Sequence, residues 1–153
     1  MTAEGKTEFV YVTYIRTTPE RLWAALTDPV LMREYWFGMH QESDFKAGSP
    51  WPLVFADGRV ADTGTVLEAA PPRRLVLEWQ NKFRPELAAE GSAQCRIEIE
   101  LQGEAVKLTI VHAMDRPNSQ FIGAVSQGWP MIVSNLKSLL ETGSVAAKET
   151  FGP

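Results

Sequence analysis

The sequence contains no unambiguous catalytic set, and two side chains whose types could do chemistry lie in one strand-like hairpin. Alternation through residues 94–114 places Cys95 and His112 on the same face as Ile97 and Ile110. An inward histidine could orient a bound molecule or move a proton near neutral pH, so His112 is the candidate catalytic residue; a satisfied core histidine is the alternative. A reactive thiolate needs a cationic, partly exposed setting and a base. Nothing near Cys95 supplies these, so a buried structural cysteine is expected.

The motifs give no support for metal, nucleotide or redox chemistry. His40 follows Gly38 in a polar stretch and is expected to be exposed. The sequence has no HxxxH or CxxC spacing and no P-loop, GxGxxG or GxSxG string. We therefore predict no metal site and no cofactor. The sequence does not decide which face of the sheet carries the Asp62 side chain, because a bulge at Gly64 would move it to the opposite face.

Composition indicates one ordinary globular domain. The chain has 153 residues, and its 15 basic and 19 acidic side chains give a net charge of −4. No basic cluster suits nucleic acid or an anionic membrane, and no apolar run is long enough to span a bilayer. A single cysteine and the polar start "MTAEGKTEF" lead us to expect a cytoplasmic protein. We predict a single domain over 1–153, with flexible ends at 1–7 and 144–153.

The first third of the chain should form one strand and two short helices. Residues 8–16 are β-branched and aromatic, which favours a strand. Thr18 can cap a helix that has Pro19 at its first position, although Thr17 and Glu20 offer a competing capping box. Asp28 and a following proline repeat the pattern, which predicts a second short helix ending near Gly38.

The middle of the chain should form antiparallel strands. A hairpin is predicted at Asp57-Gly58, and a second connection at the double proline of residues 70–74. Residues 74–80 are expected to form the next strand, residues 82–93 a loop with a short helical turn, and residues 94–114 a hairpin that turns near Gly103. The inward residues of that hairpin are expected to be Cys95, Ile97, Ile99, Leu101, Val106, Leu108, Ile110 and His112.

A long amphipathic helix should begin near Asn118 and end at Gly143. Its apolar face consists of Phe121, Val125, Gly128, Trp129, Ile132, Leu136 and Leu139. Gly128 should bring the helix backbone close to its partner. Pro130 projects to the outer side, so the helix is expected to bend there, convex to solvent. The alternative is a break, with a new helix capped by Ser126.

Three strings carry a resemblance to a known superfamily: "TTPERLWAALTDPVLMREYW", "GTVLEAAPPRRLVLEW" and "GWPMIVSNLKSLLETG". They resemble the START-like, helix-grip superfamily, also called SRPBCC, and within it the homologues of a heat-shock-protein ATPase activator. The resemblance covers roughly residues 9–143. It implies an α+β fold in which a curved antiparallel sheet wraps around the long C-terminal helix, with two short helices after the first strand and an internal cavity. These strings are structural and define no reaction.

The aromatic side chains are expected to line that cavity, because one helix cannot cover a whole concave sheet. The alternative is that they fill the core. The predicted ligand-binding residues are Trp36, Trp51, Phe55, Leu77, Trp79, Ile97, Ile110, His112, Phe121, Val125, Trp129 and Ile132. The leading hypothesis is binding of a small hydrophobic, lipid-like or aromatic molecule. The alternatives are an aromatic cyclase or dehydratase resembling polyketide cyclases, with His112 as acid or base, and an ATPase-activator-like interaction protein. Catalysis and a homodimer are left open.

Overall fold

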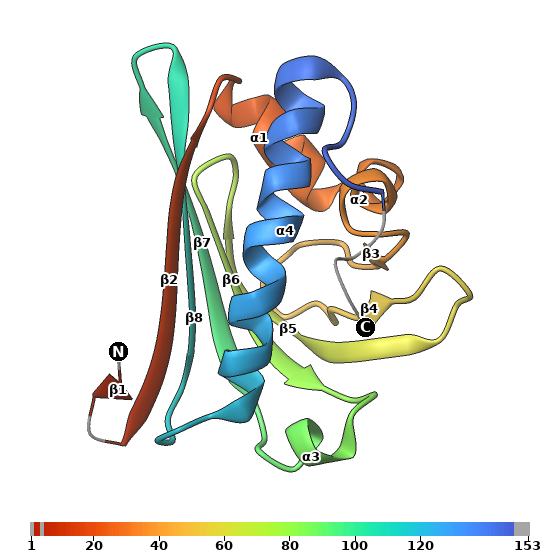
Figure 1. Ribbon diagram of the computed structural model, residues 1–153, viewed down its shortest axis with the longest axis vertical. Coiled ribbons are helices and arrows are strands. Elements are labelled where there is room, and N and C mark those ends of the chain that lie inside the picture. Colours follow the sequence, from red (N-terminus) through yellow and green to blue (C-terminus); the bar gives the residue numbers. More distant parts are fainter. Residues whose placement is uncertain (1, 4, 149–153) are drawn as a thin grey trace.

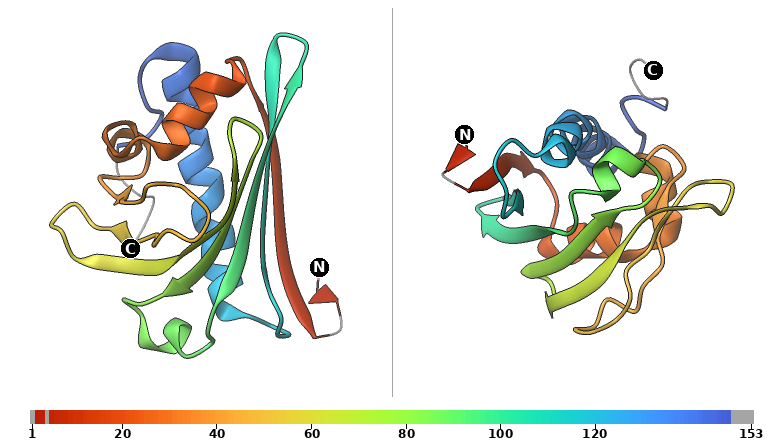
Figure 2. Two further views of the ribbon diagram at one scale, coloured as in Figure 1. Left: turned by 180° about the vertical axis from the view of Figure 1, so that it is seen from behind. Right: turned by 90° about the horizontal axis from the view of Figure 1, so that it is seen from below.

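One antiparallel sheet curves around a long helix in the computed structural model, which describes residues 2–3 and 5–148. The strand order is β1-β2-β8-β7-β6-β5-β4-β3. Figure 1 shows α4 lying across the sheet, and the view from below in Figure 2 shows the strands curving around one side of it. The predicted α+β helix-grip fold is confirmed.

The elements follow the predicted order closely. The strands are β1 Thr2–Ala3, β2 Lys6–Ile15, β3 His40–Gln41, β4 Leu53–Val54, β5 Val60–Ala70, β6 Arg74–Asn81, β7 Ala93–Gln102 and β8 Ala105–Met114. The helices are α1 Pro19–Thr27, α2 Pro29–Tyr35, α3 Pro85–Ala88 and α4 Gln120–Thr142. No helix in the described part of the chain is long and apolar enough to cross a membrane.

Side-chain caps start the two short helices. Thr18 accepts a hydrogen bond from the backbone N–H of Arg21 (3.1 Å), so α1 adopts the Thr18 register and not the competing box of Thr17. Asp28 caps α2 in the same way through the N–H of Val30 (2.9 Å). A buried hydrogen bond links the two helices, since the Tyr35 hydroxyl of α2 donates to the carbonyl of Ala25 in α1 (2.9 Å).

A close approach of two strands depends on Gly64 in β5. A Cβ atom at this position would lie only 1.8 Å from the carbonyl oxygen of Glu78 on β6, so only glycine fits. The bulge in β5 lies further along, between Val66 and Glu68. Both features belong to the β5–β6 ladder, which carries Asp62 and Trp79 of the candidate site.

The long helix is continuous through Pro130, so the alternative of a break with a new helix capped by Ser126 is wrong. Ser119 caps the helix by accepting from the N–H of Ile122 (3.1 Å), and the Glu90 carboxylate accepts from the N–H of Gln120 (2.9 Å). These bonds satisfy N–H groups that have no partner inside the helix. Glu90 also ties the segment after α3 to the start of α4. The helix ends at Gly143, whose φ of 88° is left-handed.

The apolar face of α4 packs on β2 and β8. The predicted residues Phe121, Trp129, Ile132 and Leu136 are buried, while Val125 and Leu139 are only partly buried; Ile122, Val133 and Asn135, which the pattern did not include, are buried as well. The stripe is therefore wider than a strict helical repeat indicates.

Two burial predictions are wrong. Leu101 is 62% exposed, because the tip of the β7–β8 hairpin projects away from the helices (Figure 1). His40 is buried, with Nε2 2.8 Å from Oε2 of Glu42 and 3.4 Å from Nη2 of Arg33. Alternation assigns each residue to one face of the sheet, but it does not show how much of that face the helices cover.

The predicted flexibility of the ends stays a prediction. Thr2–Ala3 pairs with Lys6 and Thr7 as a short hairpin, and the N–H of Ala147 donates to Oδ1 of Asn135 on α4 (2.8 Å). Residues 1, 4 and 149–153 lie outside the described part.

A pair of glycine substitutions tests the close approach of β5 to β6. Gly64→Ala should lower the free energy of unfolding by at least about 1–3 kcal/mol, because the new methyl group overlaps the backbone of Glu78. Gly123→Ala is the control, because nothing lies within 4 Å of the added Cβ in the exposed part of α4. It should raise the free energy of unfolding by roughly 0.5–1 kcal/mol. Chemical denaturation measures both, and a Gly64→Ala variant as stable as the parent protein would contradict the packing described.

Candidate functional site

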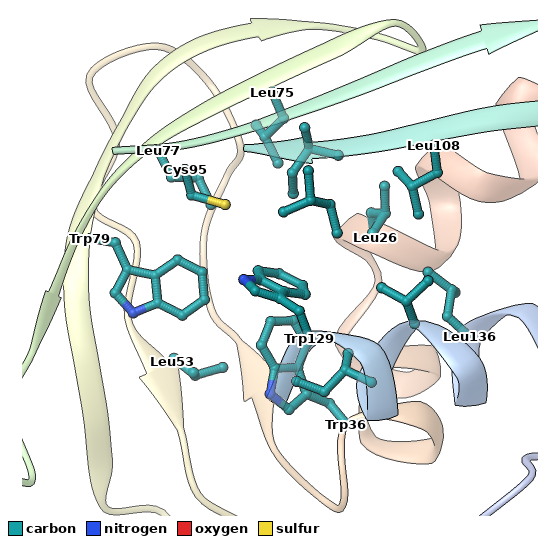
Figure 3. Close-up of a cluster of buried hydrophobic side chains, with 14 of the residues drawn as sticks. Leu26, Trp36, Leu53, Leu75, Leu77, Trp79, Cys95, Leu108, Trp129 and Leu136 are labelled. Carbon is teal, nitrogen blue, oxygen red and sulfur yellow. The ribbon is translucent and has the colours of Figure 1, made fainter. Parts of the chain in front are cut away.

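A cluster of aromatic rings fills the concave side of the sheet beside α4. Trp36, Trp51, Trp79 and Trp129 are each at most 5% exposed. Ring centroids are 4.4 Å apart for Trp51 and Trp79, 5.9 Å for Trp79 and Trp129, and 5.4 Å for Trp36 and Trp129. Figure 3 shows the indoles of Trp36, Trp79 and Trp129 gathered together below Cys95 and Leu77 of the sheet. The predicted aromatic residues are thus largely brought together, in contact with one another.

Three of these four indoles are held by buried hydrogen bonds. Trp51 Nε1 donates to Oε1 of Gln41 (2.7 Å), and Trp79 Nε1 donates to Oδ2 of Asp62 (2.8 Å). Trp129 Nε1 donates to Nδ1 of His112 (3.1 Å). An indole N–H can only donate, so each bond fixes both the ring and the role of its acceptor.

Trp36 differs from the other three. Among the described residues, its indole N–H has no hydrogen-bond partner, and packing alone holds the ring. It directly follows α2 and precedes Phe37 and Gly38, which both have positive φ values (54° and 84°). Trp36 is therefore the one indole of the four whose position depends on packing against Tyr35, Trp79 and Trp129 and on no hydrogen bond to another described residue.

Asp62 is a buried carboxyl group whose side the sequence left open. It accepts from Trp79 and also from Nδ2 of Asn81 (2.9 Å), its partner across the β5–β6 ladder. Burial raises the pKa of Asp62, although the hydrogen bonds from Trp79, Lys82 and Asn81 act in the opposite direction. Sequence reasoning missed Gln41 and Asn81 completely. Alternating polarity gave no signal for them, since their roles depend on which strands are neighbours.

His112 lies at the centre of the cluster and is 0% exposed. Its ring is 4.8 Å from that of Trp79 and 5.4 Å from that of Phe121, measured between centroids. Burial lowers the pKa of His112 to about 3, so the imidazole is neutral at neutral pH. Because Nδ1 accepts from Trp129, the proton of the neutral ring lies on Nε2. Within the described structure this buried N–H has no hydrogen-bond partner.

The other predicted ligand-binding residues divide into two groups. Leu77, Ile97, Ile110 and Ile132 are buried in the same core. Val125 is only partly buried against it, and Phe55 lies elsewhere, with its ring 5.2 Å from that of Phe83 and the Arg59 guanidinium 4.8 Å above it. The predicted close approach at Gly128 is wrong, since an added Cβ would meet only Cδ1 of Ile132, at 4.0 Å.

Cys95 faces His112 across the β7–β8 ladder and is fully buried, and burial raises the pKa of its thiol. This is the setting of an unreactive structural cysteine. Residues 2–3 and 5–148 contain no group of three His, Cys, Asp or Glu side chains that could hold a metal ion. A shallow hollow lies apart from the aromatic cluster and is lined by charged residues such as Lys6, Glu78 and Arg116; it includes none of the predicted ligand-binding residues.

Solved structures similar to this one share the fold at low sequence identity. CalU16 from Micromonospora echinospora matches with a TM-score of 0.70 and 19% identity, over 89% of this chain and 77% of that chain. The Aha1 dimer from Colwellia psychrerythraea matches with a TM-score of 0.70 and 18% identity, over 90% and 98%. PFC0360w, an HSP90 activator from Plasmodium falciparum, matches with a TM-score of 0.69 and 20% identity, over 87% and 95%.

No curated protein sequence matches the chain. A protein-family model does match, over residues 16–141, which include α1, α2 and nearly the full length of α4. This chain therefore belongs to the family described as "Activator of Hsp90 ATPase homolog 1-like protein".

Proposed function

We propose that the protein binds a small, uncharged aromatic or apolar molecule between the sheet and α4, and that the molecule accepts a hydrogen bond from His112. The observation that carries this proposal is the unpartnered Nε2–H group of His112 among aromatic rings. A buried donor without a partner costs about 1–3 kcal/mol. A ligand with a carbonyl or ether oxygen would remove that cost, whereas an interior built only for packing would gain from an apolar residue here.

The same environment selects against charged ligands. His112 stays neutral because burial lowers its pKa to about 3, and the rings around it are apolar. A carboxylate placed there would lose its hydration and meet no buried cation in return. Neutral acceptors such as ketones, quinones and esters fit the site best.

Trp36 is the ring that would make room for such a ligand. The indoles of Trp51, Trp79 and Trp129 are each fixed by a hydrogen bond, while the Trp36 ring has none among the described residues. Its centroid lies 6.3 Å from that of Trp79 and 5.4 Å from that of Trp129. A flat ligand that displaced Trp36 would therefore contact both of these rings.

Binding is better supported than catalysis. A general base at His112 needs a free lone pair, but Nδ1 accepts from Trp129 and Nε2 carries the proton. The buried carboxyl of the cluster, that of Asp62, already accepts hydrogen bonds from Trp79 and Asn81. An ATPase-activator role has the family description as its support, and no contact inside the aromatic cluster bears on it.

Isothermal titration with three probes tests the role of His112. Acetophenone should bind in a saturable way. Its isostere α-methylstyrene, which has CH2 in place of the oxygen, should bind about 2–10-fold more weakly, and benzoate should not bind. His112→Leu should remove the preference for the ketone, and His112→Gln, which keeps a donor, should retain it. A preference that survives in His112→Leu would contradict this assignment.

Trp36→Ala tests the displaced ring. The variant should bind acetophenone about tenfold more tightly than the parent protein, because no ring has to move first. Trp23→Ala, which removes a partly buried indole from α1, is the matched control and should leave affinity nearly unchanged. Trp36→Phe gives a milder change if the alanine variant is too unstable. If neither the parent protein nor any Trp36 variant binds a neutral aromatic probe, the proposed function is wrong.

The stability of the protein should depend on pH through His112. Its pKa is about 3 when folded and about 6.5 when unfolded, so the unfolded state binds the proton first as pH falls. The contribution of the neutral ring is complete above pH 6.5 and is lost below it. Between pH 6 and pH 4 the free energy of unfolding of the parent protein should fall by about 1.4 kcal/mol per pH unit more than that of His112→Leu. Urea denaturation at a series of pH values measures this free energy. The same pH dependence in both proteins would show that His112 is not buried in its neutral form.

A further inference from the structure

Strand β2 forms an edge of the sheet that is open along much of its length. In the strand order, β2 lies between β8 and the two-residue strand β1, which pairs only with Lys6 and Thr7. In the described part of the chain, no strand covers the edge of β2 from Phe9 to Ile15 (Figure 1). An uncovered edge is a template for pairing with another strand.

The register shows which backbone groups face this edge. The β2–β8 ladder is regular from Thr7 to Ile15, and in such a ladder the N–H and C=O of alternate residues point away from the partner strand. The carbonyl of Tyr14 accepts from Nζ of Lys137 (2.6 Å), and the N–H of Arg16 donates to Oε2 of Glu141 (2.8 Å). These two contacts identify the even-numbered residues as the ones that face outward. The N–H and C=O groups of Val10 and Val12 therefore also point to the open edge.

The side chains of the same residues form an apolar row on the outer face of the sheet. Val10, Val12 and Tyr14 are 52%, 44% and 49% exposed. Glu8 continues the row at one end and Arg16 at the other. Such a row has a negative end, an apolar middle and a positive end. It is therefore complementary to an identical row that runs antiparallel to it.

We infer that β2 pairs with β2 of a second copy of this chain, antiparallel, with Val12 opposite Val12 of the second copy. This register places Val10 opposite Tyr14 and Glu8 opposite Arg16 on both sides of a twofold axis, and it extends the sheet across both molecules. A shift that placed Val10 opposite Val12 would instead bring Lys6 opposite Arg16. Repulsion between these like charges favours the first register.

The interactions that must change are exposed ones. The Arg16 guanidinium now lies 3.5 Å from Glu104, and Nζ of Lys6 lies 3.6 Å from the Glu8 carboxylate. All four side chains are at least partly exposed, so both ion pairs are easily exchanged. Lys137 would release the carbonyl of Tyr14 to the N–H of Val10 in the second copy, and Glu141 would release the N–H of Arg16 to the carbonyl of Glu8 in the second copy. Lys137 keeps its ion pair with Glu141 (2.7 Å) after that release.

Analytical ultracentrifugation of the full chain over a range of concentrations tests the pairing. The parent protein should show a monomer–dimer equilibrium, and Val12→Lys should raise the dissociation constant about tenfold or more, since two lysines would meet at the axis. Leu101→Lys is the matched control, because Leu101 is an exposed apolar residue at the distant hairpin tip. It should leave the equilibrium unchanged. A monomeric parent protein, or a dimer indifferent to Val12→Lys, would overturn the inference.

Charge reversal tests the register. Glu8→Arg and Arg16→Glu should each weaken the dimer, because each places like charges opposite one another. The double variant should restore it, because the ion pair re-forms with its signs exchanged. Circular dichroism checks that each variant is folded. Dimerisation that is lost in both single variants and not regained in the double variant would refute the pairing of Glu8 with Arg16.

Discussion

The hydrogen bond from Trp79 Nε1 to Asp62 Oδ2 is the interaction on which the interior depends. The Trp79 ring contacts Trp36, Trp51, Trp129 and His112, so its orientation sets that of the cluster. Asp62 is itself fixed by Asn81 opposite it on β6. The close strand approach at Gly64 lies in the same ladder, with Gly64 directly opposite Trp79. A local backbone constraint thereby positions an indole in the middle of the core.

The aromatic cluster fills the part of the curved sheet that α4 does not cover. The helix α4 packs on β2 and β8, and one helix cannot fill the rest of a strongly curved surface. Here indoles fill it, and each large ring brings a polar N–H into the interior. Gln41, Asp62 and His112 satisfy three of those groups, because an unpaired N–H in the core would be costly. Only at His112 does satisfying the indole leave another buried donor without a partner.

The sequence predicted the fold well because the fold depends on local patterns. Caps at Thr18 and Asp28 and alternation in the β7–β8 hairpin are each visible in short stretches of the chain. The errors concern long-range geometry. Alternation assigns Leu101 to the inner face, but this residue lies beyond the part of the sheet that the helices cover. The Phe55 ring packs on Phe83 and not in the core. The partners of the indoles could not be predicted, since Asp62 and Asn81 meet only through the β5–β6 register and Gln41 belongs to a two-residue strand without periodicity.

The two proposed interactions use opposite faces of the same part of the sheet. Alternate residues of β2 divide between them: Phe9 and Tyr11 pack against the core, while Val10 and Val12 face solvent. Phe9 is the register partner of His112 on β8, so the strand at the edge lies next to the strand that carries the unpartnered donor. Pairing through backbone groups and outer side chains leaves the inner side chains in place. A second copy at the edge could therefore stiffen the wall of the interior site without touching it, because a strand hydrogen-bonded on both sides is held more firmly than an edge strand.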